Sequence, residues 1–71
     1  MFKLKIKDWR VRENRIGKES QYELVIDCEL EPNGRTVLIT SVVRSDEEAL
    51  DVYTDICYVV NAGNVAIENP D

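Results

Sequence analysis

The sequence predicts one small α+β domain, in which an antiparallel three-stranded sheet packs against a single α-helix in the order β-β-β-α. Residues 22–30 alternate between apolar and polar side chains, pass through Pro32-Asn33-Gly34 and continue into an apolar run at 36–43. This is the pattern of two strands joined by a turn. A helix-start signal at Ser45 then precedes apolar residues spaced three and four positions apart, as in an amphipathic helix. A chain of 71 residues has room for one core, so we assign 1–71 to one domain.

The first strand has lysines on one side and, on the other, Phe2, Leu4 and Ile6. Beyond Asp8 the apolar side changes parity, because Trp9 and Val11 now carry it. A β-bulge near Lys7-Asp8 would produce this change. The polar residues 13–20, which include Gly17, are expected to form a loop or the tip of a long hairpin.

The second strand has the most regular alternation. Its apolar side consists of Tyr22, Leu24, Ile26, Cys28 and Leu30, and its polar side of Gln21, Glu23, Asp27 and Glu29. Val25 is the exception, since it is apolar on the polar side. If this strand runs antiparallel to the first, its acidic row faces Lys3, Lys5 and Lys7. The two charged rows would neutralise each other and help to set the register.

The third strand is apolar on both sides, with Val37, Ile39 and Val43 on one face and Leu38 and Val42 on the other. One helix can cover only one face of a sheet, so the second face needs another cover. Three candidates remain open. They are the tail residues 65–67, which could also add a short fourth strand, a folded-over Trp9, or another molecule.

The helix is predicted to begin with the capping box Ser45-Asp46-Glu47-Glu48, whose carboxylates suit the positive end of the helix dipole. Its core stripe is Ala49, Leu50, Tyr53, Ile56, Cys57 and Val60, and its outer face holds Asp51, Thr54, Asp55 and Tyr58. Gly63 is the expected stop, and 69–71 the frayed tail.

Charge is unevenly distributed along the chain, whose formal net charge is −5. Residues 1–18 hold seven cations and two carboxylates (7 − 2 = +5), whereas residues 19–71 hold two cations and twelve carboxylates (2 − 12 = −10). No apolar run approaches the roughly 20 residues of a membrane span, and residues 1–7 alternate with lysine rather than form a signal-peptide core. We therefore expect a cytoplasmic protein without a membrane partner.

The residue inventory argues against catalysis. The chain has no histidine and no Gly-rich nucleotide motif, which excludes Ser-His and Cys-His nucleophile pairs. Asp51 and Asp55 alone offer too few oxygens for a divalent ion. Cys28 and Cys57 are expected to be small buried hydrophobic residues, with a bridge between them as the alternative. We expect no enzymatic activity, no cofactor and no metal.

The first functional hypothesis is a small acidic module or inhibitor that binds a protein and self-associates, as a homodimer, and is of phage or mobile-element type. The residues expected to bind protein are Asp51, Asp55 and Tyr58 on the helix and Leu38 and Val42 on the sheet. The doubly apolar third strand and an open sheet edge motivate it.

Nucleic-acid contact is the second hypothesis, through Trp9, Arg10, Arg12, Arg15 and Lys18, an aromatic ring beside four cations. The strand order, and the helix start Asp46-Glu47-Glu48-Ala49, resemble the small sheet-plus-helix DNA-binding domains of phage and transposon integrases. Those sheets are basic, whereas the second strand here is acidic. We therefore do not expect tight binding to nucleic acid.

A third hypothesis reverses the second. Seven carboxylates could imitate a phosphate backbone: Glu29, Glu31, Asp46, Glu47, Glu48, Asp51 and Asp55. In size, acidity and layout the chain resembles phage-encoded anti-restriction and anti-CRISPR inhibitors, which implies a basic nucleic-acid-binding protein as the partner.

Overall fold

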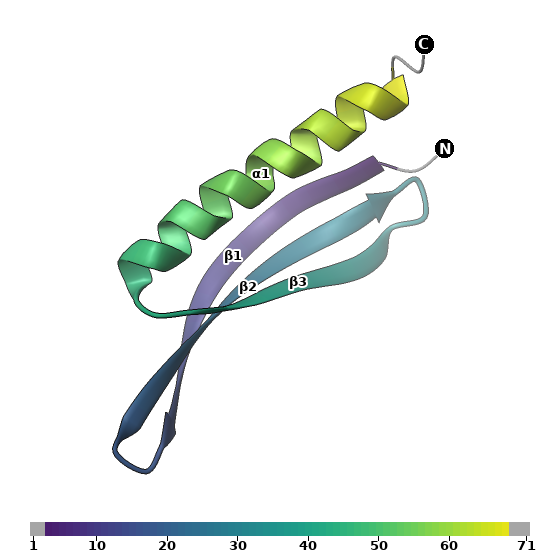
Figure 1. Ribbon diagram of the computed structural model, residues 1–71. Helices are drawn as coiled ribbons and strands as arrows, with labels where there is room; N and C mark the ends of the chain where they lie inside the picture. Colours follow the sequence, from purple (N-terminus) through teal and green to yellow (C-terminus); the bar gives the residue numbers. More distant parts are fainter. Residues whose placement is uncertain (1–2, 69–71) are drawn as a thin grey trace.

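The computed structural model describes the backbone of residues 3–68 and the side chains of residues 3–64, so the expectations for Phe2 and for the tail 69–71 lie outside it. The elements are β1 (Lys3–Ile16), β2 (Glu19–Glu31), β3 (Arg35–Val43) and α1 (Asp46–Glu68). The strands form one antiparallel sheet in the order β1-β2-β3. The helix lies across one face of this sheet, along β1 (Figure 1). The predicted α+β fold is confirmed.

The predicted bulge in β1 is present. Ile6 pairs with Cys28, and the register shifts before the next pair, Asp8 with Asp27. The extra residue turns Trp9 back to the helix side of the sheet, where it packs against the core together with Ile6. Without it, Trp9 and Ile6 would point to opposite faces.

Both predicted turns depend on a glycine in the left-handed region. Residues 13–20 form the tip of a long hairpin, in which Ile16 pairs with Glu19 and Gly17 has φ of +68°. In the second turn, Gly34 has φ of +73° and its N–H donates to the Leu30 carbonyl at 2.8 Å. An L-residue would be strained at either position.

The core lies between α1 and the central strand β2. Its buried residues are Leu24, Ile26, Cys28, Val43 and Ala49, and around them pack Leu4, Ile6, Trp9, Val11, Tyr22, Val37, Ile39, Val52, Tyr53 and Ile56. This cluster is the apolar side of each strand, as the alternation predicts, plus a helical stripe that includes Val52, which was not predicted to belong to it. Leu50 departs from the predicted stripe, since it is 52% exposed.

The helix starts where predicted and ends later. The Glu48 N–H donates to the Ser45 hydroxyl at 3.1 Å, which is the expected cap. The prediction that Gly63 stops the helix is wrong, because α1 continues to Glu68 and Gly63 does not have a positive φ. Asn64, just beyond, bonds to β1, and this contact compensates for the weak helix propensity of glycine.

The proposed fourth strand is also wrong, because 65–67 belong to the helix. A segment whose backbone hydrogen bonds are made within a helix has none left for a sheet edge.

Candidate protein-binding surface

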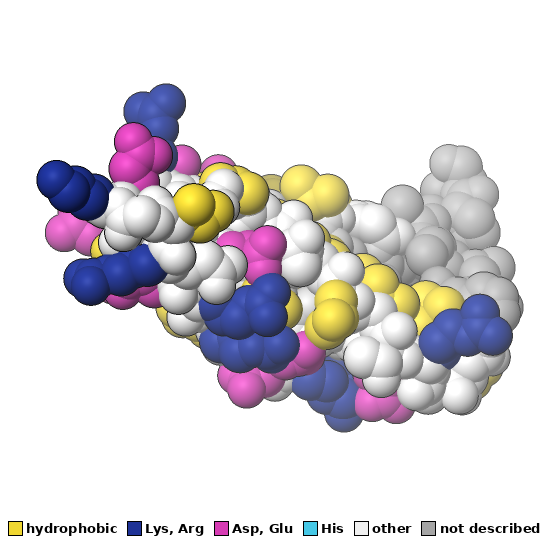
Figure 2. Space-filling view, turned by 90° about the horizontal axis from the view of Figure 1, so that it is seen from below, with side chains coloured by type: hydrophobic (Ala, Val, Ile, Leu, Met, Phe, Trp, Pro, Cys, Tyr) yellow, Lys and Arg dark blue, Asp and Glu magenta, His cyan; other side chains and the backbone are white. Residues whose placement is uncertain are grey.

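The face of the sheet opposite α1, called here the open face, has its side chains in three columns. β1 supplies mainly cations, β2 mainly carboxylates, and β3 threonines and apolar residues. Rows across the three strands run Lys5–Glu29–Thr36, Asp8–Asp27–Leu38, Arg10–Val25–Thr40 and Arg12–Glu23–Val42. Figure 2, the view from below Figure 1, shows hydrophobic side chains interspersed with basic and acidic ones.

The cation and carboxylate columns neutralise each other. Lys7 Nζ lies 3.1 Å from Glu29 Oε2. Two arginines form ion pairs with the same column, Arg10 with Asp27 and Arg12 with Glu23. The predicted match between a basic and an acidic row is therefore present, with arginines sharing the role expected of lysines. Each exposed pair contributes at most about 1 kcal/mol, but together they leave β1 and β2 with little uncompensated charge.

The third column leaves apolar surface exposed. Leu38 is 54% and Val42 62% exposed, whereas Val25, between Arg10 and Thr40 on the same face, is 1% exposed. The odd residue in the alternation of β2 is thus buried on the open face, with Thr40 opposite it on β3 and Leu38 and Val42 two positions to either side of Thr40. We call Val25, Leu38, Thr40 and Val42 the β3 patch.

Of the covers expected for this face, Trp9 is on the helix side and 65–67 continue the helix. Leu38 and Val42 therefore remain open to solvent.

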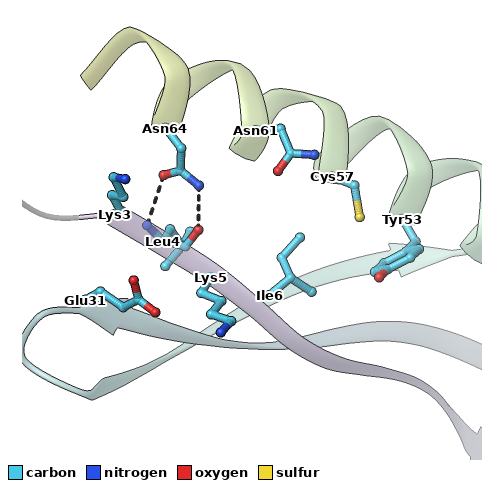
Figure 3. Close-up of a pocket in the computed structure, with 9 residues that line it drawn as sticks. All are labelled: Lys3, Leu4, Lys5, Ile6, Glu31, Tyr53, Cys57, Asn61 and Asn64. Carbon is cyan, nitrogen blue, oxygen red and sulfur yellow. Dashed lines mark hydrogen bonds between the residues drawn. The ribbon is translucent and has the colours of Figure 1, made fainter. Parts of the chain in front are cut away.

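The two edges of the sheet differ in their protection. β1 contains six lysines and arginines and a bulge, both of which discourage a further strand from pairing. Its Leu4 is also bridged to the helix, since the Leu4 N–H donates to Asn64 Oδ1 at 3.1 Å and Asn64 Nδ2 donates to the Leu4 carbonyl at 2.8 Å (Figure 3). β3 contains one charged residue, Arg35 at its start, no proline and no register shift. The β3 edge is the less protected of the two.

The outer face of α1 is acidic, as predicted. Asp51, Asp55 and Tyr58 are all exposed, Tyr58 at 79%. α1 contains no lysine or arginine, and among the side chains at 3–64 no salt bridge reaches Asp51 or Asp55. The wider set of carboxylates is not brought together. Glu29 is opposite Thr36 on the open face, whereas the helical carboxylates lie on α1, which packs against the other face of the sheet (Figure 1).

The structure separates the residues expected to contact nucleic acid. Trp9 stacks on Tyr53, with ring centroids 4.8 Å apart and an interplanar angle of 21°, on the helix side. Arg10 and Arg12 are ion-paired on the open face. Arg15 lies on the exposed hairpin, with its Nε 3.8 Å from Glu13 Oε1. Lys18 is at the turn of the same hairpin.

A cavity of about 390 Å³ lies between α1 and the start of β1. Its lining comprises Lys3, Leu4, Lys5, Ile6, Glu31, Tyr53, Cys57, Asn61 and Asn64 (Figure 3). Asn64 was not predicted as a contact residue, although it is a polar residue at stripe spacing after Cys57 and Val60.

The two cysteines are free thiols, so the alternative of a bridge is not realised; Cys28 is buried as predicted, whereas Cys57 is only half-buried. Burial raises the pKa of the Cys28 thiol, because a thiolate is poorly solvated there. A hydrogen bond with Cys57 is the main cause that raises the pKa of the Tyr53 hydroxyl. Among the described side chains, no group of three Cys, Asp or Glu residues is placed to hold a metal ion.

No protein-family model, curated protein or solved structure matches the chain. In the part of the chain that the structure describes, no helix has both the length and the apolar character needed to cross a membrane.

Proposed function

We propose that this chain is a small, non-enzymatic protein-binding module that acts through the β3 patch and the adjoining β3 edge. The observation that carries the proposal is the exposure of Leu38 and Val42, at 54% and 62%, beside the fully buried Val25. Covering these exposed apolar side chains with a partner would remove them from water, which favours binding.

The edge of β3 adds a second source of affinity. An edge strand offers one row of backbone N–H and C=O groups to a further strand, and many protein–peptide contacts use this mode of binding. Side chains on the open face then supply the specificity. The ion pairs on β1 and β2 would frame the apolar contact as a polar rim.

Site-specific photocross-linking tests this proposal in the native host. A photoreactive phenylalanine derivative replaces Leu38, and the matched control replaces Leu50 on α1, which is the same residue type at nearly the same exposure, 52%. We expect covalent protein adducts from position 38 and few from position 50. Adducts at neither position, or equal amounts at both, would contradict binding through the β3 patch.

The acidic outer face of α1 supports a second candidate, capture of a basic partner such as a nucleic-acid-binding protein. Asp51 and Asp55 are exposed and have no cation beside them among the described side chains. Their negative charges can therefore attract a positively charged partner. Charge reversal to Asp51→Lys and Asp55→Lys should abolish capture of a basic protein. Reversal of Glu13, a carboxylate of β1 that lies beside Arg15, is the control. Equal capture by all variants would remove this candidate.

A further inference from the structure

We infer that the partner of the β3 edge is a second copy of this chain, paired antiparallel through β3 about a two-fold axis at Thr40. This inference rests on the proposed function and names the occupant of the same surface. It predicts a continuous six-stranded sheet in the dimer, with both helices on one side, because a two-fold axis perpendicular to the sheet preserves its faces.

Strand geometry restricts the registers available. Opposed residues in an antiparallel pair lie on the same face, so a symmetric β3 pair must be centred on a residue rather than between two. Centred on Thr40, Leu38 lies opposite Val42 of the second copy, and Val42 lies opposite Leu38 of the second copy. The exposed apolar side chains of the two β3 patches then lie side by side on the open face, on either side of the axis, and shield each other's flanks.

The neighbouring register is a poorer match. Centred on Ile39, the pairing would place Leu38 opposite Thr40 of the second copy and Val42 opposite Thr36 of the second copy. Each exposed apolar side chain would then face a hydroxyl group. Cross-strand apolar pairs favour the register centred on Thr40.

The charged residues lie only at the ends of this interface. Pairing about Thr40 brings Arg35 of one copy near residues 44–46 of the other, where Arg44 is followed by Ser45 and the carboxylate of Asp46. By symmetry this contact occurs at both ends of the interface. Between these ends, residues 36–43 of β3 contain no charged side chain, so two copies meet without like-charge repulsion.

The other edge does not compete for this role. A second copy approaching β1 would meet its six cations, its bulge and the Asn64 bridge to Leu4. The helix lies along β1 rather than over the β3 edge (Figure 1), so it leaves room for a strand beside β3.

Engineered cysteines test the register directly. Thr40 and Thr36 are both exposed threonines on the open face of β3. In the proposed dimer the two copies of Thr40 face each other with Cα atoms about 5 Å apart, within reach of a disulfide. The two copies of Thr36 are eight positions apart, roughly 27 Å. The T36C variant is therefore the matched control, and the unsubstituted chain, oxidised in parallel, reports any background from Cys28 and Cys57.

We expect T40C to become largely a covalent dimer under mild oxidation and T36C to stay at the background level. Light scattering of the unsubstituted chain at rising concentration should approach twice the 8.2 kDa of one chain, and Leu38→Lys should return the mass to one chain. Equal cross-linking of both variants, or a single-chain mass at millimolar concentration, would overturn the inference.

The two proposals can fail separately. A monomer whose position 38 photocross-links to a different protein refutes the homodimer and keeps the protein-binding module. A monomer with no adduct at position 38 refutes both.

Discussion

Replacing Asn64 by alanine tests how the helix protects the β1 edge. The Asn64 amide makes two hydrogen bonds to Leu4, at 3.1 and 2.8 Å, from a half-buried position. Each is expected to contribute about 0.5–1.5 kcal/mol net. The better helix propensity of alanine offsets about 0.5 kcal/mol. We therefore expect the free energy of unfolding to fall by about 1–2 kcal/mol.

Asn61→Ala is the matched control, since Asn61 lies one turn earlier in α1, lines the same cavity and is exposed (Figure 3). Circular dichroism during thermal unfolding measures both variants. In a domain of this size 1 kcal/mol corresponds to about 4–8 °C in Tm, so Asn64→Ala should melt clearly below the unsubstituted chain. Asn61→Ala should match or slightly exceed the unsubstituted chain.

Amide hydrogen exchange gives an independent readout, because the Leu4 N–H loses its acceptor in the Asn64→Ala variant. Its exchange should accelerate while amides of β2 keep their protection. Equal melting temperatures for the Asn64 and Asn61 variants, together with unchanged exchange at Leu4, would refute the reasoning.

Three further predictions concern apolar side chains on the two faces of the sheet. Trp9→Ala, which removes the stacking on Tyr53, should lower the free energy of unfolding by about 3 kcal/mol or more by circular dichroism; a loss below about 1 kcal/mol would place Trp9 outside the core. Val25→Ala should cost about 1.5–2 kcal/mol in urea unfolding, although Val25 faces away from the helix; no loss would mean that the open face has no packed base. Burial raises the pKa of Cys28 above its ordinary 9.0, so the folded state binds its proton more tightly than the unfolded state. This contribution is complete below pH 9 and is lost as pH rises through the folded pKa. Stability should therefore fall above pH 9, less so in Cys28→Ala, and an alkylating reagent should modify Cys57 before Cys28.

Local patterns were sufficient to predict most of the fold. The parity change between Ile6 and Trp9 predicted the bulge, and the alternation of β2 predicted the burial of Leu24, Ile26 and Cys28, although not that of Val25 on its polar side. These features depend on where successive side chains point, which the strand period determines residue by residue. The sequence also predicted an apolar side of β3 that the helix cannot cover, but it left open whether Trp9 or residues 65–67 cover Leu38 and Val42, which the structure shows exposed.

Long-range contacts decided the rest. Gly63 is a helix stop by propensity, yet α1 passes through it, and the bond from Asn64 to Leu4 spans 60 positions of the chain. Trp9 and Arg10 are neighbours in sequence and were expected to act together, but adjacent strand residues point to opposite faces. Trp9 is stacked in the core and Arg10 forms an ion pair on the open face.

The amino-acid order by itself determined the strands, their turns, the capped helix and an excess of apolar surface on β3, because each depends on interactions within a few residues. The tertiary structure alone decided which edge of the sheet is shielded and which carboxylates form no ion pair. Those outcomes depend on which side chains the folded chain brings together, such as Asn64 with Leu4 at one edge and Val25 with Thr40 beside the other.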